Sequence, residues 1–160
     1  MIYLIAAVSK NGVIGKRGKL PWHFKKDLER FKNLTMGHCV VFGRKTFQLL
    51  KELKGRKVIV LSRDENFKKG KIIVKHSVEE IVNNYLISKE ICFIAGGEEI
   101  YKEFLPFCDT IYLSLIDKEF SGDKFFPTFE MNQFEKLFSE KVIDDGVQIE
   151  FITLKKKSLK

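Results

Sequence analysis

Strand-like and helix-like segments alternate along most of the chain, and this alternation limits the fold more than any other feature of the sequence. Eight short segments are rich in β-branched and aromatic residues, as strands are, and they cover residues 2–8, 39–42, 57–61, 71–75, 91–95, 110–117, 134–143 and 148–154. Four helical patterns lie between the earlier strands, over residues 24–34, 44–50, 78–85 and 98–104. The alternation predicts an α/β fold in which about four helices flank a mostly parallel eight-stranded sheet.

The last two strands are joined by "DDG" (residues 144–146), which is typical of a hairpin turn. We therefore expect an antiparallel C-terminal hairpin, which makes the sheet mixed. No repeat, low-complexity linker or change of composition divides residues 1–160, so a single domain is predicted. The apolar runs are too short to cross a bilayer, and the N-terminal residues lack a signal-peptide pattern. These features predict a cytoplasmic protein without a membrane partner.

The sequence is basic, with 29 Lys and Arg against 21 Asp and Glu and a formal net charge of +8. Such a charge favours an anionic ligand or a polyanion, although lysines scattered over a solvated surface explain it equally simply. A nucleic-acid-binding module is the alternative of a different class, but it needs clustered cations between exposed aromatic residues. The 15 Phe residues lie mostly in apolar patterns instead. We therefore expect no nucleic-acid partner.

Three cysteines, Cys39, Cys92 and Cys108, lie in or beside apolar segments. Their spacing matches no C-x-x-C pair and no Cys/His metal-ligand set, so no metal site is predicted. We interpret them as reduced residues in or near the core of a cytosolic protein, with a redox role as the alternative.

One carboxylate of the helix predicted at 24–34 falls on its apolar face. Phe24, Leu28 and Phe31 are spaced i, i+4 and i+7, and Asp27 lies within this stripe. The other charges nearby, including Arg30, face away or lie at the edge of the stripe. Asp27 is either a first-turn residue that complements the helix dipole or a functional carboxylate, and the pattern alone does not decide between them.

Glycine follows two predicted strands directly, as Gly43 in "GRKT" and Gly96 in "GGEEIY". Such turns place the N–H groups of a helix start at the carboxyl edge of the sheet, where phosphates bind. The sequence has neither a Walker A loop nor a G-x-G-x-x-G motif after its first strand, which argues against an NTPase and the standard dinucleotide fold. Arg44 and Arg63 at these strand ends favour NADP over NAD, because arginine suits the extra 2′-phosphate.

Several blocks of the sequence resemble bacterial dihydrofolate reductase in order and spacing, and they read "IAAVSKNGVIGKRGKLPWHFKKDLERFK", "GRKTF", "GRKVIVLSR", "FIAGGEEIYKEFLP", "IYLSLID" and "GDKFFP". The resemblance covers essentially the whole chain. It implies an NADPH-dependent oxidoreductase that reduces 7,8-dihydrofolate to tetrahydrofolate, by hydride transfer to pterin C6 with protonation of N5. Tetrahydrofolate supplies one-carbon metabolism and thymidylate synthesis. Antifolate inhibitors as ligands and a monomeric protein are also implied.

The NADPH-dependent reductase of riboflavin synthesis shares this kind of sheet and is a second enzyme to consider. It lacks the Pro-Trp sequence and the helical aspartate, so Trp22, Asp27 and Arg56 together argue against it.

The resemblance also implies roles for individual residues. Asp27 would bind the pterin ring and Trp22 would order a water molecule, which makes these two the catalytic residues. Arg56 would grip the glutamate α-carboxylate of the substrate. The implied substrate-binding residues are Ile5, Ala7, Asp27, Leu28, Phe31, Leu50, Leu53, Arg56, Ala95 and Ser114. The implied cofactor-binding residues are Ala7, Ile14, Gly15, Lys16, Arg17, Gly18, Lys19, Leu20, Gly43, Arg44, Lys45, Thr46, Leu61, Ser62, Arg63, Gly96, Gly97, Glu98, Glu99 and Tyr101.

Further details follow from the same resemblance. Gly96 and Gly97 match a pair that is joined by a cis peptide in the family, and Asp123 matches a carboxylate that braces the loop near Gly15. The resemblance leaves open whether Lys51, Lys75 and His76 contact a ligand.

Overall fold

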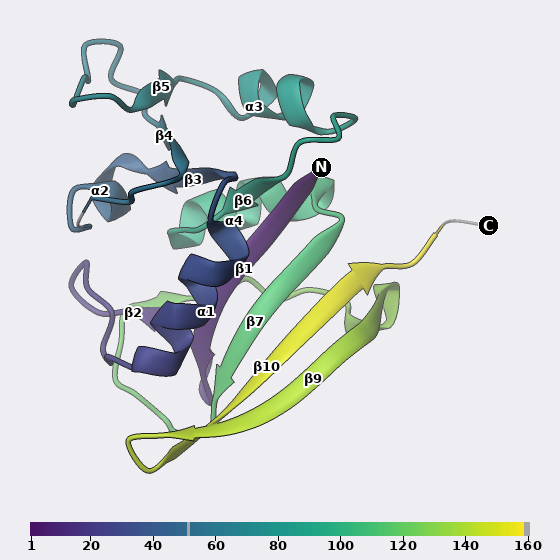
Figure 1. The fold of residues 1–160 in the computed structure, drawn as a ribbon. Helices are drawn as coiled ribbons and strands as arrows, with labels where there is room; N and C mark the ends of the chain where they lie inside the picture. Colours follow the sequence, from purple (N-terminus) through teal and green to yellow (C-terminus); the bar gives the residue numbers. More distant parts are fainter. Residues whose placement is uncertain (51, 159–160) are drawn as a thin grey trace.

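The computed structural model describes residues 1–50 and 52–158 and contains one eight-stranded sheet with the strand order β5-β4-β3-β6-β1-β7-β10-β9 (Figure 1). Its strands are β1 (Ile2–Ser9), β3 (Cys39–Gly43), β4 (Lys57–Leu61), β5 (Ile73–Lys75), β6 (Cys92–Ile94), β7 (Thr110–Ile116), β9 (Phe134–Asp144) and β10 (Val147–Lys156). The helices are α1 (Lys25–Thr35), α2 (Arg44–Phe47), α3 (Val78–Tyr85) and α4 (Glu98–Phe104), with short 3₁₀ helices at Leu105–Phe107 and Met131–Gln133.

The pairing of the strands confirms a mixed, mostly parallel sheet. All pairs from β5 across to β7 are parallel, whereas β10 runs antiparallel to both β7 and β9. The turn between β9 and β10 has positive φ at both Asp145 (50°) and Gly146 (75°). Positive φ at both central residues is the requirement of the type I′ hairpin turn, and Asp-Gly meets it well. The "DDG" prediction is therefore confirmed.

A second, two-stranded sheet was not predicted. It pairs β2 (Val13–Gly15) with β8 (Lys124–Phe125) in antiparallel fashion. Elements of three and two residues are too short to show a period of two, and glycine in the first weakens the strand pattern further. Residues 13–15, which the sequence suggested to lie in a loop, therefore form a strand.

The four predicted helices are present, and their ends follow from local hydrogen bonds. The Ser77 side chain accepts a hydrogen bond from the Glu80 N–H at 3.3 Å and caps α3 as its sequence predicts. Helix α2 is shorter than the predicted 44–50 and ends at Phe47. The Leu49 and Leu50 N–H groups bond to carbonyls three residues back, at 3.2 and 3.0 Å, so the chain tightens into turns there.

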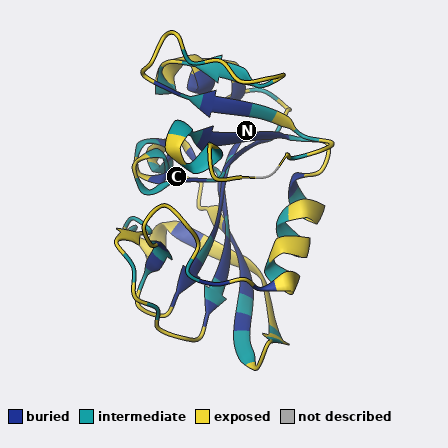
Figure 2. Ribbon diagram, turned by 90° about the vertical axis from the view of Figure 1, so that its left-hand side faces the viewer, coloured by how far each residue is buried: buried dark blue, intermediate teal, exposed yellow. Residues whose placement is uncertain are grey.

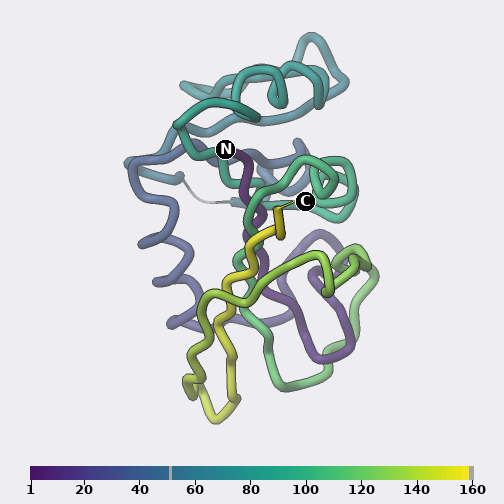
Figure 3. Tube along the Cα trace, turned by 90° about the vertical axis from the view of Figure 1, so that its right-hand side faces the viewer, coloured from purple at the N-terminus to yellow at the C-terminus, as the bar shows by residue number. Residues whose placement is uncertain are grey.

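Burial is greatest in the middle of the sheet, where the strands are dark blue in Figure 2. Leu4 on β1, Val40 on β3 and Ile94 on β6 are fully buried, as parallel strands covered on both faces must be. β1 runs through the middle of the molecule (Figure 3), and β1, β3, β4 and β6 all end at the same edge of the sheet. Side chains that directly follow these strands are thereby brought together. In the described ranges, no helix is long and apolar enough to span a membrane.

Candidate active site

A cavity opens at the carboxyl ends of β1 and β6, bounded by α1, β7 and the residues that follow α2, and its empty space is about 820 Å³ with the part open to solvent included. Its wall is mostly apolar, with a few polar side chains, as in many small-molecule sites. The lining residues are Ile5, Ala6, Ala7, Leu20, Asp27, Leu28, Arg30, Phe31, Phe42, Thr46, Leu50, Leu53, Ala95, Tyr101, Tyr112 and Ser114.

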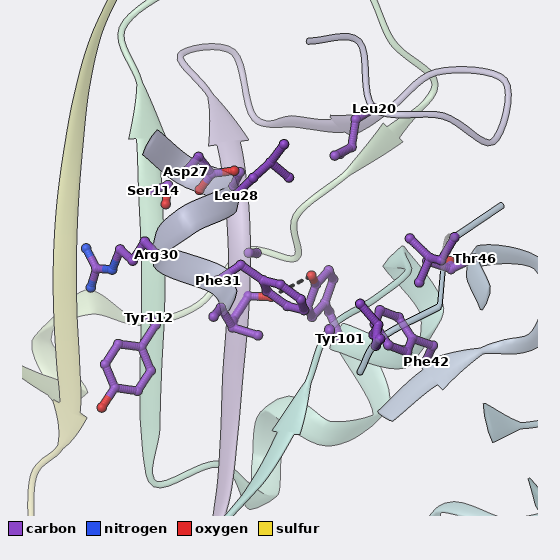
Figure 4. A pocket seen from close by; sticks show the side chains of 16 residues that line it. Leu20, Asp27, Leu28, Arg30, Phe31, Phe42, Thr46, Tyr101, Tyr112 and Ser114 are labelled. Atoms are coloured by element: carbon purple, nitrogen blue, oxygen red, sulfur yellow. Dashed lines mark hydrogen bonds between the residues drawn. The ribbon is translucent and has the colours of Figure 1, made fainter. Parts of the chain in front are cut away.

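Asp27 carries the carboxylate of this cavity. It lies in the first turn of α1, and its side chain meets the Ser114 hydroxyl, which comes from β7 (Figure 4). Burial raises the pKa of Asp27 above the usual range of an aspartate, and Asp144 adds to this rise. The Ser114 hydroxyl and the Arg30 guanidinium act in the opposite direction. The charged form of Asp27 is therefore poorly solvated and favours a ligand that donates hydrogen bonds or positive charge.

Two residues of the apolar stripe, Leu28 and Phe31, face the cavity, whereas Phe24, just before α1, is buried in a packed cluster. Leu28 keeps 41% of its surface exposed although it lies next to Asp27, and Leu50 on the opposite wall keeps 39%. Apolar side chains left open on two facing walls are suited to a flat, apolar ligand. The structure brings together here eight predicted substrate-binding residues besides Asp27, namely Ile5, Ala7, Leu28, Phe31, Leu50, Leu53, Ala95 and Ser114.

Arg56 does not line this cavity. It borders a neighbouring hollow with Lys32, Met36 and Lys54, where its Nε donates to the Lys54 carbonyl oxygen at 3.0 Å. Its Nη1 donates to the Thr35 hydroxyl at 3.4 Å. The hollow contains three cations against one carboxylate, that of Glu52, and Leu53 of the main cavity lies between Glu52 and Lys54 in the chain.

Trp22 also lies outside the lining of the cavity. Its ring is buried in a cluster with Val13, Phe24 and Ile149, and it packs against Phe120 with ring centroids 5.0 Å apart. The indole Nε1 is a buried donor with no partner among the described residues. A buried donor of this kind calls for an acceptor that the protein itself does not provide.

Seven of the twenty predicted cofactor residues, from Ile14 to Leu20, lie in β2 and in the loop that follows it. Backbone hydrogen bonds of 2.8 and 3.0 Å join Lys16 and Lys19, with Arg17 and Gly18 at positive φ between them. The carboxylate of Asp123 accepts from the Arg17 N–H at 3.2 Å, as the resemblance implied for this aspartate. Of this loop only Leu20 lines the cavity, while Ile14 packs on the core and Gly15 is buried within β2.

The two glycine turns meet at the carboxyl edge of the sheet. The Gly43 N–H donates to the Gly96 carbonyl oxygen at 2.9 Å, and the Gly96–Gly97 peptide is cis, as the resemblance implied. A Cβ on Gly97 would lie 3.1 Å from the Thr46 hydroxyl oxygen, so the two turns pack closely. Thr46 and Tyr101 reach the cavity from these turns. Glu98 and Glu99 instead point to Lys102 on the same helix, within 4.0 Å.

The cations predicted to bind phosphate lie near the ends of β3 and β4. Arg44 is half-buried with its Nη1 3.6 Å from the Asp64 carboxylate, while Lys45 and Arg63 are exposed. Leu61 ends β4, and Ser62 follows it with its hydroxyl bonded to the Asp64 N–H at 3.1 Å. The helix α2 is a single turn, so its dipole contributes less here than these side chains.

The structure describes two of the three residues whose ligand contacts the sequence leaves open, Lys75 and His76. Lys51 lies outside the described residues. The carbonyl of Lys75 accepts from the Ser62 N–H at 2.9 Å, and the His76 Nδ1 is 2.9 Å from the Ser62 carbonyl oxygen. Lys75 and His76 thus join the segment that carries Arg63.

Four lining residues were missed from the sequence: Ala6, Arg30, Phe42 and Tyr112. Tyr112 lies two residues before Ser114 on β7, so the period of two along a strand could have revealed it. Phe42 directly precedes the glycine turn at Gly43, and this position at the end of a strand could also have indicated that it lines the site. Ala6 alternates with Ile5 and Ala7, and no pattern distinguishes it.

Arg30 was expected to face away from the apolar stripe or to lie at its edge, and the structure places it in the wall of the cavity. It lines the cavity one turn after Asp27, with its guanidinium directed away from Leu28 (Figure 4). The guanidinium carbon lies 4.5 Å from the ring centroid of Phe151 and 5.6 Å from that of Phe138. Its buried Nη1 has no hydrogen-bond partner in the described ranges. These aromatic faces hold the cation that a helical pattern assigns to the surface.

No group of three or more His, Cys, Asp or Glu side chains within the described ranges could hold a metal ion. The polar and charged side chains that line the cavity are those of Asp27, Arg30, Thr46, Tyr101, Tyr112 and Ser114.

Comparison with known proteins matches this geometry to one family. A family model described as dihydrofolate reductase matches residues 1–156. The chain is similar to the dihydrofolate reductases of Haemophilus influenzae (42% identical, covering 86% of this chain and 85% of that protein) and Bacillus subtilis (34%, covering 99% and 96%). Its structure is similar to dihydrofolate reductase from Enterococcus faecalis complexed with NADP(H) and RAB-propyl, with a TM-score of 0.92, 35% identity and coverage of 99% and 97%. The chain therefore belongs to the dihydrofolate reductase family.

Proposed function

We propose that this chain reduces 7,8-dihydrofolate to 5,6,7,8-tetrahydrofolate with NADPH, and that Asp27 binds the pterin ring of the substrate. The observation that carries the proposal is a carboxylate with a raised pKa in an otherwise apolar cavity. The N3–H and 2-amino groups of a pterin form an amidine-like edge that donates two hydrogen bonds. A carboxylate accepts both, and each partner offsets the poor solvation of the other.

Protonation of pterin N5 precedes or accompanies hydride transfer to C6, and the site favours it electrostatically. The anionic Asp27 stabilises a cationic pterin in a cavity of low polarity, where charges interact more strongly than in water. The unpartnered Nε1–H of Trp22 supports a role in ordering a water molecule near the substrate, because this donor faces no protein acceptor. Trp22 acts from behind the wall of the cavity and not as part of it.

The residues at the carboxyl edge of the sheet fit NADPH. This cofactor supplies the hydride when it is bound. The turns at Gly43 and Gly96–Gly97 pack closely beside Thr46 and Tyr101 of the cavity wall, and glycine there carries no side chain that would keep a cofactor away from the backbone. Arg44, Lys45 and Arg63 provide positive charge for its phosphates, and arginine is suited to the 2′-phosphate that distinguishes NADPH from NADH. The loop from Ile14 to Leu20, with Leu61, Ser62, Thr46, Glu98, Glu99 and Tyr101, completes the proposed cofactor site.

The rest of the substrate extends from the pterin along the apolar walls. Leu28, Phe31, Leu50 and Leu53 suit an aminobenzoyl group, and the cationic hollow beyond them contains Arg56. We assign Arg56 to the glutamate α-carboxylate, for which a guanidinium offers two parallel hydrogen bonds.

We further propose that residues 1–160 form a single domain that acts as a monomer in the cytoplasm, with antifolates as inhibitors and no nucleic-acid partner. One continuous sheet supports the single domain. Three free cysteines support a reducing compartment.

The decisive experiment follows the absorbance of NADPH with purified protein and dihydrofolate, for the parent chain, Asp27→Asn and Glu29→Gln. Asn keeps the shape of the side chain but loses the anion, so turnover at neutral pH should fall by about 10²–10⁴-fold. Turnover of this variant should recover partly in acid, where the substrate is protonated by solvent. Glu29 is exposed on the same helix and its variant controls for a general effect of charge.

Two results would contradict the proposal. The absence of turnover in the parent chain would refute the activity. Full activity of Asp27→Asn at neutral pH would refute the role of Asp27, provided that both variants bind NADPH and have the circular dichroism spectrum of the folded parent.

A further inference from the structure

Two of the three cysteines are in contact on neighbouring strands, far from the residues that line the cavity. The register pairs Cys39, the first residue of β3, with Cys92, the first residue of β6. Their side chains therefore share one face of the sheet, and the two Sγ atoms are 3.6 Å apart. Parallel neighbours lie about 4.8 Å apart, which is within the Cα separation of about 4.4–6.8 Å that a disulfide requires.

The surroundings of the two sulfurs are unequal. Lys57 is in register with Cys39 on its other side, and its ammonium donates to the Tyr85 hydroxyl at 3.1 Å. The hydrogen bond from the Cys92 thiol lowers the pKa of Cys39, and Tyr85 and Lys57 lower it further, against the effects of burial and of Glu90. Donating that bond and being buried both raise the pKa of Cys92. Cys39 is thus the better nucleophile, with Cys92 placed to resolve it.

Accessibility limits what can react here. Cys39 is 5% exposed and Cys92 is 0% exposed, so only a very small reagent reaches the first sulfur. Cys108 is also buried, but it lies at the end of a 3₁₀ helix, and burial raises its pKa to about 11. Cys108 therefore serves as an internal reference for an unactivated thiol.

We propose that Cys39 and Cys92 form a reversible dithiol–disulfide site that is oxidised by hydrogen peroxide. The Cys39 sulfur attacks one peroxide oxygen, the O–O bond breaks, and the released hydroxide takes the thiol proton and leaves as water. Cys39 is then a sulfenic acid. The Cys92 sulfur attacks the Cys39 sulfur, the S–O bond breaks, and the hydroxyl leaves with the Cys92 proton as a second water. Two thiols lose two electrons in total, and one peroxide is reduced to two waters.

The site is independent of the proposed reductase chemistry, because neither cysteine lines the cavity. The sulfurs must approach from 3.6 Å to about 2.05 Å, across strands whose spacing the parallel ladder fixes. A disulfide is returned to two thiols by exchange with an external dithiol, so the site suits a reversible modification.

The test treats the folded, full-length protein with hydrogen peroxide, quenches it, and counts free thiols with N-ethylmaleimide after denaturation. The count should fall from three to one, peptide mapping should link Cys39 to Cys92, and dithiothreitol should restore all three thiols. Cys108→Ser should form the same linkage, and Cys92→Ser should not. Lys57→Met should slow the reaction by about threefold or more, because it lowers the thiolate fraction of Cys39.

Other outcomes overturn the proposal. These are three free thiols after a dose that oxidises an exposed thiol, a linkage that includes Cys108, and independent oxidation of single cysteines. Equal oxidation rates in the parent and in Lys57→Met would show that local unfolding, and not activation of Cys39, controls the reaction. Circular dichroism during oxidation confirms that the protein stays folded.

Discussion

The Tyr101 hydroxyl donates a buried hydrogen bond of 2.7 Å to the Ile5 carbonyl oxygen, and this bond joins α4 to β1 at the edge of the cavity (Figure 4). Both residues line the cavity. Burial raises the pKa of the tyrosine, so it remains a neutral donor. The bond fixes the end of β1 where substrate and cofactor are proposed to meet.

Tyr101→Phe should therefore destabilise the fold. The variant leaves the Ile5 carbonyl buried without this donor, which costs about 1–3 kcal/mol in the free energy of unfolding. Urea unfolding of the parent, Tyr101→Phe and Tyr112→Phe measures the effect. Tyr112 is only half-buried, so its variant should stay within about 0.5 kcal/mol of the parent. Equal stability of the two variants would mean that the hydrogen bond contributes nothing.

Asp27→Asn should be more stable than the parent at neutral pH. The folded-state pKa of Asp27 is raised, so the parent has its full stability below the unfolded pKa and loses stability as pH rises through the folded value. Asn has no such dependence. The difference in melting temperature should be largest at neutral pH and vanish in acid, and Glu29→Gln should show no such trend. A less stable Asn variant at neutral pH would contradict the assigned direction of the pKa.

Arg30→Met should raise the pKa of Asp27 further. The guanidinium is a cation that favours the ionised carboxylate, and Met keeps the length of the side chain without its charge. Carbon-13 NMR titration of the Asp27 carboxyl follows the change directly. Arg30→Lys retains the charge and should leave the pKa nearer to that of the parent. Identical titrations in the parent and in Arg30→Met would show that Arg30 only packs on Phe151.

Arg44→Gln and Arg63→Gln should reduce the preference for NADPH over NADH. A charge-assisted hydrogen bond to the 2′-phosphate contributes about 1.5–3 kcal/mol, so each loss should lower kcat/KM with NADPH by about 10- to 100-fold. The value with NADH should change little. Lys68→Gln is a control on the same exposed surface. Equal losses with both cofactors would place the arginines at a phosphate that the two share.

Much of the fold could be predicted because local and global signals agree. All eight strands of the large sheet lie within two residues of their predicted starts and ends, as at Thr110–Ile116, because turn residues bound each apolar run. β10 extends to Lys156, beyond the predicted end at 154, where its last residues continue the ladder with β9. The β2–β8 pair could not be predicted, since so few residues carry no period.

The site could be predicted in composition more than in arrangement. Periodicity identifies Asp27 as a misplaced charge, but only the fold shows that Leu28 beside it is open to a cavity. Arg30 escaped prediction because strands from the far end of the chain supply the aromatic rings that hold it. Trp22 and Arg56 stand in sequence motifs that resemble those of the family. The structure places both outside the cavity that contains Asp27.

The central place of β1 has a consequence for how this chain reaches its native state. Both sheet neighbours of β1, β6 and β7, are made of residues from 92 onward, so its ladders join the first residues of the sequence to its second half. During synthesis, the first strand must wait for most of the polypeptide before it gains a partner on either side. Such non-local pairing closes long loops and slows folding. The nascent apolar segment that becomes the floor of the active site is thus the one exposed longest to aggregation and to chaperones.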